Sequence, residues 1–188
     1  FTPLHSYTRV EDSKGNIVME PNTAPIQAID PQTGYVMNRL LYNVVHSGSY
    51  PGGASPTAAG TAVGPNSNGE QMESVGKTGT TNDDKDRWYV GLTPYYVTAV
   101  WWGYDMPDLP NHNFYRRWSA AARTNIPVNV WKTLMETVQE DYEVIDFPEM
   151  PEGVQQLASC TISGNLANSG CPTQMGFYTK LRTPDQCM

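Results

Sequence analysis

The sequence contains few basic residues and no cluster of them. Lys and Arg together number 12 against 19 Asp and Glu, which gives the 188-residue chain a formal net charge of −7. Because nucleic-acid phosphates are bound by clustered Lys and Arg side chains, this balance argues against a nucleic-acid partner. No apolar run approaches the roughly 20 residues that a membrane-spanning helix needs, and no signal-peptide pattern is present. An initiating methionine is also missing, so we expect a processed or truncated chain whose lack of an anchor says little about where its parent resides.

Cysteine is scarce and confined to the C-terminal segment, at Cys160, Cys171 and Cys187. An odd number leaves at least one thiol unpaired within the chain. No His lies near these cysteines in the sequence and no Cys-x-x-Cys spacing occurs, which argues against a zinc site. We therefore expect one disulfide or three free thiols.

The acidic run "DDKDR" at 83–87 is the other place where a metal site comes into question. It lacks the Gly and the distal Glu of a calcium-binding loop, so a solvated turn is the better interpretation. We expect neither a metal nor a cofactor.

The composition is that of a globular protein. Hydrophobic residues make up 39% of the chain and aromatic residues 11%. At this length, the chain is long enough for one ordinary domain with a hydrophobic core.

The N-terminal part predicts a hairpin and a helix. In residues 7–20, turn-forming residues 13–16 lie between two β-branched stretches, which is typical of a hairpin. Residues 33–46 carry apolar side chains at helical spacing, with Thr33 as the expected N-cap and Gly48 as the expected stop. The Gly-, Ser- and Pro-rich stretch that follows is expected to be a loop with one short helix at 57–62.

The central part predicts three consecutive strands, "MESVGKTGTT", "RWYVGLTP" and "YYVTAVWWGY". Short connections between them favour an antiparallel meander. The next segment, "IPVNVWKTLMETVQ", predicts a helix with Pro127 in its first turn and an apolar stripe formed by Val130, Trp131, Leu134, Met135 and Val138. The expected fold class is α+β, with an antiparallel sheet packed between helices and the helix at 127–139 covering one face.

The composition changes after residue 145. We expect residues 1–145 to form one structural unit and residues 146–188 to form an extension rich in Cys, Pro and Gly. "VQQLASCTISG" in this extension predicts one further strand.

The triplet Gly76-Lys77-Thr78 raises two alternatives. A phosphate-binding loop needs a Gly five residues before Gly76, where Gln71 stands, and a helix after the triplet, where a strand is predicted. Lys77-Thr78-Gly79, by contrast, is one of the three signatures of penicillin-recognising serine acyltransferases. Its place on a strand that is followed directly by two more strands fits the second alternative.

The similarity extends well beyond this triplet. The segment "GKTGTTNDDKDRWYVGLTPYYVTAVWWG" resembles the corresponding segment of class A penicillin-binding proteins, the bifunctional peptidoglycan synthases. The stretches "YTRVEDSKGNIVMEP", "TGYVMNRLLYNVV", "CTISGNLANSGCP" and "TPDQC" resemble other parts of the same family, so most of the chain is covered. The resemblance implies the C-terminal portion of a penicillin-binding transpeptidase fold, with the segment 146–188 as a C-terminal extension.

The resemblance also implies roles for individual residues. Lys77 would support proton transfer and the electrostatics of the nucleophile, and Thr80 would contribute a backbone N–H to the oxyanion hole. Thr78 and Thr80 would offer hydroxyls to the carboxylate of the substrate or of a β-lactam. Gly79 would allow close approach of the ligand, which could pair with an edge strand. The implied partners are peptidoglycan stem peptides, β-lactam antibiotics and the upstream remainder of the same domain.

The other two signatures of the family, Ser-x-x-Lys and Ser-x-Asn, have no convincing counterpart. Ser74 stands three residues before Lys77, but on a strand that spacing places two side chains on opposite faces. Ser163-Gly164-Asn165 comes after Lys-Thr-Gly and therefore in the wrong order. We expect both signatures, the glycosyltransferase domain and the membrane anchor to lie upstream, so that this chain alone is not an active transpeptidase.

Two alternatives stay open on the sequence. A serine β-lactamase shares Lys-Thr-Gly, although the long C-terminal tail speaks against it, and a non-catalytic wall-binding module could have kept the fold without the chemistry. The resemblance also implies the extracytoplasmic face of the bacterial membrane, where disulfides persist. There we predict a Cys160–Cys171 bond, helped by the turn formers between the two residues, with Cys187 free.

Overall fold

The computed structural model describes residues 1–46, 56–60, 62–82, 86–103 and 125–188. Its helices and strands in chain order are β1 (Val10–Glu11), β2 (Ile17–Met19), α1 (Pro31–Val45), β3 (Val75–Thr80), β4 (Asp86–Leu92), β5 (Val97–Gly103), α3 (Ile126–Val138), β6 (Val154–Cys160), β7 (Thr173–Thr179) and the 3-10 helix η2 (Lys180–Arg182). The strands form three antiparallel sheets, which confirms the predicted α+β class. Within the described ranges, no helix has the length and apolarity required to cross a bilayer.

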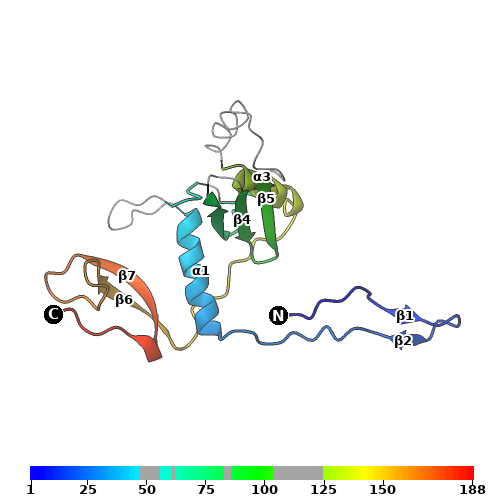
Figure 1. The fold of residues 1–188 in the computed structure, drawn as a ribbon, viewed down its shortest axis with the longest axis horizontal. Helices are drawn as coiled ribbons and strands as arrows, with labels where there is room; N and C mark the ends of the chain where they lie inside the picture. Colours follow the sequence, from blue (N-terminus) through cyan, green and yellow to red (C-terminus); the bar gives the residue numbers. More distant parts are fainter. Residues whose placement is uncertain (47–55, 61, 83–85, 104–124) are drawn as a thin grey trace.

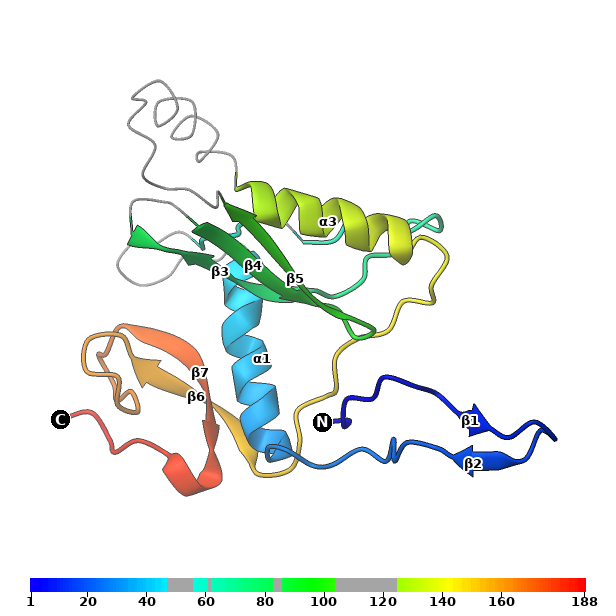
Figure 2. The same ribbon diagram turned by 45° about the vertical axis from the view of Figure 1, so that its right-hand side comes forward.

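The predicted N-terminal hairpin is present as β1 and β2, which project away from the rest of the molecule (Figures 1 and 2). The carboxylate of Asp12 accepts hydrogen bonds from the backbone N–H groups of Lys14 and Asn16, at 2.8 and 2.9 Å. Gly15 has a φ of 82°, the left-handed conformation that glycine adopts without steric cost. Both strands are exposed along their whole length, so the turn and the backbone pairing of the strands, not apolar burial, hold this hairpin together.

Helix α1 confirms the helix predicted over 33–46, but its start was predicted wrongly. Asp30 is the N-cap residue and Pro31 occupies the first turn, so Thr33 lies inside the helix. The ring of Pro31 fixes φ near the helical value and removes an N–H that would lack a partner there, which makes it a better start than Thr33. The expected stop at Gly48 falls outside the described residues.

The short helix expected at 57–62 was also predicted wrongly. Residues 57–60 form a turn, and Gly60 at its end has a φ of 72°. A left-handed residue at that point takes the chain out of helical geometry.

The predicted meander is confirmed as the sheet β3–β4–β5 (Figure 2). Both helices contact it: α1 packs against β3, and α3 packs against β4 and β5. Tyr89 on β4 and Trp131 on α3 are fully buried and meet edge to face, with ring centroids 5.3 Å apart. Burial of two large aromatic side chains in this geometry contributes both the hydrophobic effect and an aromatic pair interaction.

The apolar stripe predicted for α3 is only partly right. Trp131 and Met135 are buried, but Val130, Leu134 and Val138 are between 40 and 49% exposed. The buried face also includes Pro127 and Val128 at the start of the helix. Trp131 determines which face of α3 is turned toward the sheet. Its side chain fills the space above Gly91 on β4, where even a Cβ atom would overlap the indole.

The C-terminal segment is more regular than its composition suggests. The strand predicted over 154–164 is present as β6 but ends at Cys160, because residues 161–164 form a turn. An additional strand, β7, pairs with β6 along its full length. The sequence offers little indication of β7, because Gly176 stands in its middle and glycine is depleted in strands. The hairpin docks on α1, where Tyr35 and Phe177 meet edge to face at 5.6 Å.

Candidate functional site

Strand β3 lies at the edge of the central sheet, as the family resemblance implied. In the order β3–β4–β5, it has β4 on one side and no strand on the other among the described residues. Lys77 is paired with Val90, Thr78 with Tyr89, and Thr80 with Arg87. An edge strand carries backbone N–H and C=O groups that its own sheet leaves unpaired on one side, which is the geometry that strand addition requires.

Lys77 projects from this edge strand into solvent. Its side chain is exposed, and its Nζ donates a hydrogen bond to the carbonyl oxygen of Thr78 at 2.7 Å. This contact is local and involves no carboxylate, so the ammonium group retains donor capacity for a ligand that lies along the strand.

The face that carries Lys77 is otherwise apolar except for Asp86, whose carboxylate accepts a hydrogen bond from Nε1 of Trp101 at 3.0 Å. Side chains alternate along a strand, and Lys77 therefore shares its face with Val90 and Trp88 of β4 and with Trp101 of β5. Trp88 and Trp101 are 44 and 43% exposed, and their rings lie 6.5 Å apart. Both tryptophans therefore lie half-exposed on the face of the sheet opposite Tyr89.

The hydroxyl of Thr78 is oriented by a residue that the sequence did not single out. Thr78 Oγ1 donates to Thr57 Oγ1 at 2.8 Å, and the side-chain amide of Asn125 donates to the carbonyl oxygen of Thr57 at 3.0 Å. The turn at 57–60 and the start of α3 thereby fix the position of Thr78. The separation of the three residues in sequence explains why no local pattern pointed to Thr57 or Asn125.

Two glycines of β3 differ in their surroundings. A Cβ atom on Gly76 would overlap the hydroxyl of Tyr89, which is buried beneath the sheet. A Cβ atom on Gly79 would lie 3.4 Å from the Cβ of Trp88, close to ordinary van der Waals contact. Packing within this chain therefore requires glycine at position 76 but leaves room for a small side chain at position 79.

Ser74 is held in the core and cannot act as the nucleophile of Lys77. It is fully buried, and its Oγ accepts a hydrogen bond from the backbone N–H of Val63 at 3.2 Å. Its carbonyl oxygen lies 3.0 Å from Nε2 of His46. Ser74 is buried and Lys77 is exposed, which agrees with the opposite faces that their spacing predicted.

The Tyr89 side chain beneath β3 is a core group. Burial raises the pKa of its phenol to about 12, so it remains neutral at all physiological pH values. It supports the strand from below and has no acid–base role at neutral pH.

The other serine pattern, Ser163-Gly164-Asn165, lies in the β6–β7 connection. Gly164 has a φ of 77°, and the hydroxyl of Ser163 accepts a hydrogen bond from the backbone N–H of Asn165 at 3.2 Å. This geometry is that of a tight turn, as the sequence predicted, and the turn belongs to a different sheet from Lys77.

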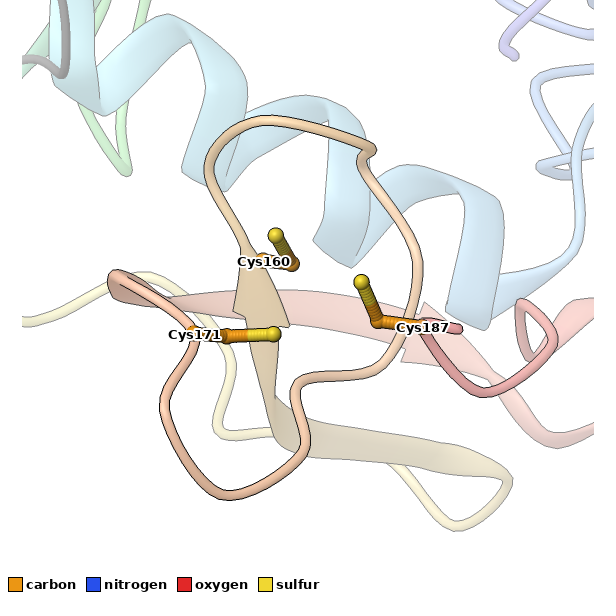
Figure 3. Close-up of side chains that lie close together, drawn as sticks. All are labelled: Cys160, Cys171 and Cys187. Atoms are coloured by element: carbon orange, nitrogen blue, oxygen red, sulfur yellow. The ribbon is translucent and has the colours of Figure 1, made fainter.

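The three cysteines come together in this C-terminal hairpin (Figure 3). Their Sγ atoms all lie within 4.8 Å of one another, and all three thiols are free in this structure. The turn formers between Cys160 and Cys171 had indicated that these two residues approach each other, but nothing in the linear spacing indicated that Cys187, among the last residues of the chain, joins them. The Cys160–Cys171 bond stays a prediction.

The environments of two of these thiols differ. Hydrogen bonds from the backbone N–H groups of Ser163 and Ile162 hold the pKa of Cys160 at about 6. A hydrogen bond from the backbone of Asn168 lowers the pKa of Cys171, but burial and the neighbouring thiols outweigh it and raise that pKa overall. Cys160 is therefore the first of the two to become a thiolate as the pH rises.

Comparison with curated proteins and with solved structures finds similarity to penicillin-binding proteins 1A. No protein-family model matches the chain. Penicillin-binding protein 1A of Clostridium perfringens is 32% identical over 166 residues, which cover 88% of this chain and 17% of the relative. Penicillin-binding protein 1A of Neisseria gonorrhoeae is 34% identical over 156 residues, which cover 80% of this chain and 17% of the relative. The chain thus spans about a sixth of the length of these curated relatives.

A solved structure shows the same fold. The crystal structure of Penicillin-Binding Protein 1A from Haemophilus influenzae matches with a TM-score of 0.62 at 18% identity, and the match covers 94% of this chain and 29% of the solved chain. At this level of identity, the match supports the arrangement of the helices and strands rather than the role of any side chain.

Proposed function

Because the chain belongs to the class A penicillin-binding proteins and corresponds to a part of their length, we propose that it forms one wall of a transpeptidase cleft that cross-links peptidoglycan. The observation that carries this proposal is the exposure of Lys77-Thr78-Gly79-Thr80 on an edge strand, with the preceding Ser74 locked in the core. In this proposal, the nucleophilic serine comes from a part of the protein outside this chain.

The proposed reaction is an acyl transfer in two steps. The serine hydroxyl attacks the carbonyl carbon of the D-Ala-D-Ala amide, its proton passes to the leaving amine, and the terminal D-Ala departs. An amine of a neighbouring stem peptide then attacks the acyl-enzyme ester and releases the serine. A β-lactam would enter the first step and remain as a stable acyl-enzyme.

Each residue of the β3 segment has a part in this proposal. The ammonium group of Lys77 stabilises negative charge that develops near the serine, and the hydroxyls of Thr78 and Thr80 bind the terminal carboxylate of the substrate. The backbone N–H of Thr80 donates to the oxyanion. In the free protein the hydroxyl of Thr78 donates its proton to Thr57, so that proton would turn from Thr57 to the carboxylate when the substrate binds.

The partners follow from the same assignment. We infer that the chain acts with the remainder of its transpeptidase domain, on stem peptides, at the extracytoplasmic face of the bacterial membrane. The half-exposed tryptophans Trp88 and Trp101 share the face of Lys77 and would lie against that remainder.

Labelling of the full-length protein with a fluorescent penicillin tests the proposal. A stable fluorescent adduct is expected for a transpeptidase, whereas rapid turnover would indicate a β-lactamase and no labelling would indicate a non-catalytic wall-binding module. The isolated 188-residue chain, incubated in parallel, should gain no drug mass by intact mass spectrometry. A shift of one drug mass located at Ser74 would contradict the assignment of that serine to the core.

A further inference from the structure

The β6–β7 hairpin lacks the hydrophobic core that normally stabilises a folded segment. Of residues 154–188, all of which the structure describes, only Val154 and Cys160 are buried. Segments shorter than about 40 residues rarely fold on hydrophobic burial alone and usually depend on disulfides, metals or association. The hairpin does dock on α1 through Phe177, but this contact lies away from the loop that joins its strands.

The backbone of this loop brings the cysteines together through three separate attachments. Cys160 donates its N–H to the carbonyl oxygen of Asn165 at 2.7 Å, and Cys171 donates to that of Asn168 at 3.2 Å. Cys187 donates to the carbonyl oxygen of Leu166 at 2.7 Å. The β6–β7 connection is thus hydrogen-bonded to the end of β6 and to the C-terminal segment. The three cysteines, one from each of these parts, lie close together (Figure 3).

The spacing of the sulfur atoms matches a metal-bound set. In a tetrahedral zinc site with Zn–S distances of about 2.3 Å, neighbouring sulfur atoms lie about 3.8 Å apart. The three Sγ atoms here all lie within 4.8 Å of one another, so shifts of about an ångström would complete the arrangement.

Polar groups approach two of these sulfur atoms. The hydroxyl of Ser163 donates a hydrogen bond to Sγ of Cys187 at 3.3 Å, and donors to sulfur orient a thiolate ligand and stabilise its charge. The thiol of Cys171 donates to Oδ1 of Asn168 at 3.0 Å, a bond that metal binding would replace. Gly164 has a φ of 77°, and its N–H donates to the carbonyl oxygen of Cys160 at 2.9 Å, which closes a tight turn beside the cluster.

We propose that Cys160, Cys171 and Cys187 form a trithiolate site that binds one soft divalent metal ion, of the class of Zn²⁺, in the reduced protein. A water molecule completes the coordination. The metal would cross-link the end of β6, the β6–β7 connection and the C-terminal segment, where buried apolar side chains are lacking. This site lies outside the central sheet and does not depend on the transpeptidase assignment.

The site competes with the predicted Cys160–Cys171 disulfide, because a disulfide sulfur is no longer a thiolate ligand. An oxidising compartment favours the disulfide and a reducing one favours the metal. The experiment therefore starts from protein in which all three thiols have been shown to react with a thiol reagent.

Titration with Co²⁺ under reducing, oxygen-free conditions tests the proposal on the 188-residue chain. One equivalent is expected to give thiolate-to-cobalt charge-transfer absorption and the intense visible bands of a tetrahedral site, and Zn²⁺ should remove both. Metal binding should weaken as the pH falls, since protons compete for the thiolates.

Single substitutions distinguish the residues that bind the metal from neighbouring residues that do not. Cys160→Ser, Cys171→Ser and Cys187→Ser should each weaken Zn²⁺ binding by more than about 100-fold, beyond the usual effect of a residue that only supports a ligand. Ser169→Ala, on the same exposed loop, is the matched control and should bind as the parent does. Cys187→His keeps a metal ligand at that position and should retain tetrahedral cobalt with altered charge-transfer absorption.

Two results would overturn the proposal. The first is reduced protein, with three reactive thiols, that shows no charge-transfer absorption at one equivalent of Co²⁺. The second is Zn²⁺ binding that is equal in the parent and in all three serine variants, which would place the metal elsewhere.

Discussion

The central sheet and the β6–β7 hairpin are both antiparallel, but they are stabilised by different means. Tyr89 of the sheet and Trp131 of α3 are fully buried against each other, in a cluster that extends to α1 through Val45. The hairpin instead gathers three cysteines at one end and buries almost nothing else. A rigid apolar support suits a strand that, in the proposed function, holds catalytic groups in place, whereas a small peripheral unit can be stabilised by a few cross-links.

The largest expected effect is on chemistry at the supported strand. In the full-length protein, Lys77→Ala should slow acylation by a β-lactam by about 10²–10⁴-fold, the usual contribution of a proton-transfer or electrostatic group. The melting temperature should hardly change, because the Lys77 side chain is exposed and makes only a local contact. Acylation rates are measured by fluorescent-penicillin labelling over time.

Lys180→Ala provides the matched control, since Lys180 is an exposed lysine on η2 beyond the hairpin. Its acylation rate should equal that of the parent. If Lys77→Ala stayed within a factor of a few of the parent, Lys77 would be a solvated strand lysine and the functional assignment of the segment would fail.

The second effect concerns the core below the strand. Trp131→Ala removes a fully buried indole and should destabilise the central sheet by about 3–5 kcal/mol. Hydrogen exchange should accelerate in β4, β5 and α3, with little change in β6 and β7. Leu134→Ala, on the half-exposed face of the same helix, should cost less than about 1 kcal/mol. Equal acceleration in both regions would show that the sheet and the hairpin unfold as one unit.

The sequence predicted the elements of the central sheet because they are strongly patterned. Aromatic and β-branched runs separated by polar turns indicated β4 and β5, and Pro127 marked the start of α3. The edge position of β3 was implied by the family resemblance and agrees with its place as the first strand of the meander. Local residue preferences agree with tertiary packing here, so single-sequence reasoning succeeds.

The predictions from the sequence failed where contacts between residues far apart in the chain determine the structure. The rotation of α3 depends on Gly91, where Trp131 finds space, and no pattern within the helix contains that information. Asn125 and Thr57 hold Thr78 from positions far apart in the sequence. The cysteine cluster likewise depends on the pairing of β6 with β7. The sequence did not predict β7, because Gly176 stands in its middle. Long-range contacts, not weak propensities, set the limit of what the sequence alone could predict.

The third effect belongs to the hairpin. Under oxidising conditions, we predict a Cys160–Cys171 disulfide that stabilises the folded protein by about 2–3 kcal/mol in the loop-entropy model, with Cys187 free. A peptide map without reductant tests the connectivity, and the shift in urea midpoint on Cys171→Ser gives the energy. A bridge from Cys187 to either partner, or three thiols alkylated without prior reduction, would show that the predicted pairing is wrong.

The smallest expected effects are those of substitutions at two glycines of β3, one required for packing and the other for ligand binding. Gly76→Ala forces a methyl group into the buried Tyr89 hydroxyl and should lower stability by about 1–3 kcal/mol, the cost of overpacking a core. Gly79→Ala meets only ordinary contact with Trp88, so its stability should fall by less than about 1 kcal/mol. Its acylation rate should nevertheless drop, by up to roughly 100-fold, because the added methyl group displaces a ligand paired with the edge strand. Thermal melts of the two variants check the predicted stabilities, and penicillin-labelling rates check the predicted acylation rates. A Gly79→Ala protein with unchanged acylation would mean that no ligand approaches the strand there, whereas one as unstable as Gly76→Ala would mean that this glycine, too, is required for packing.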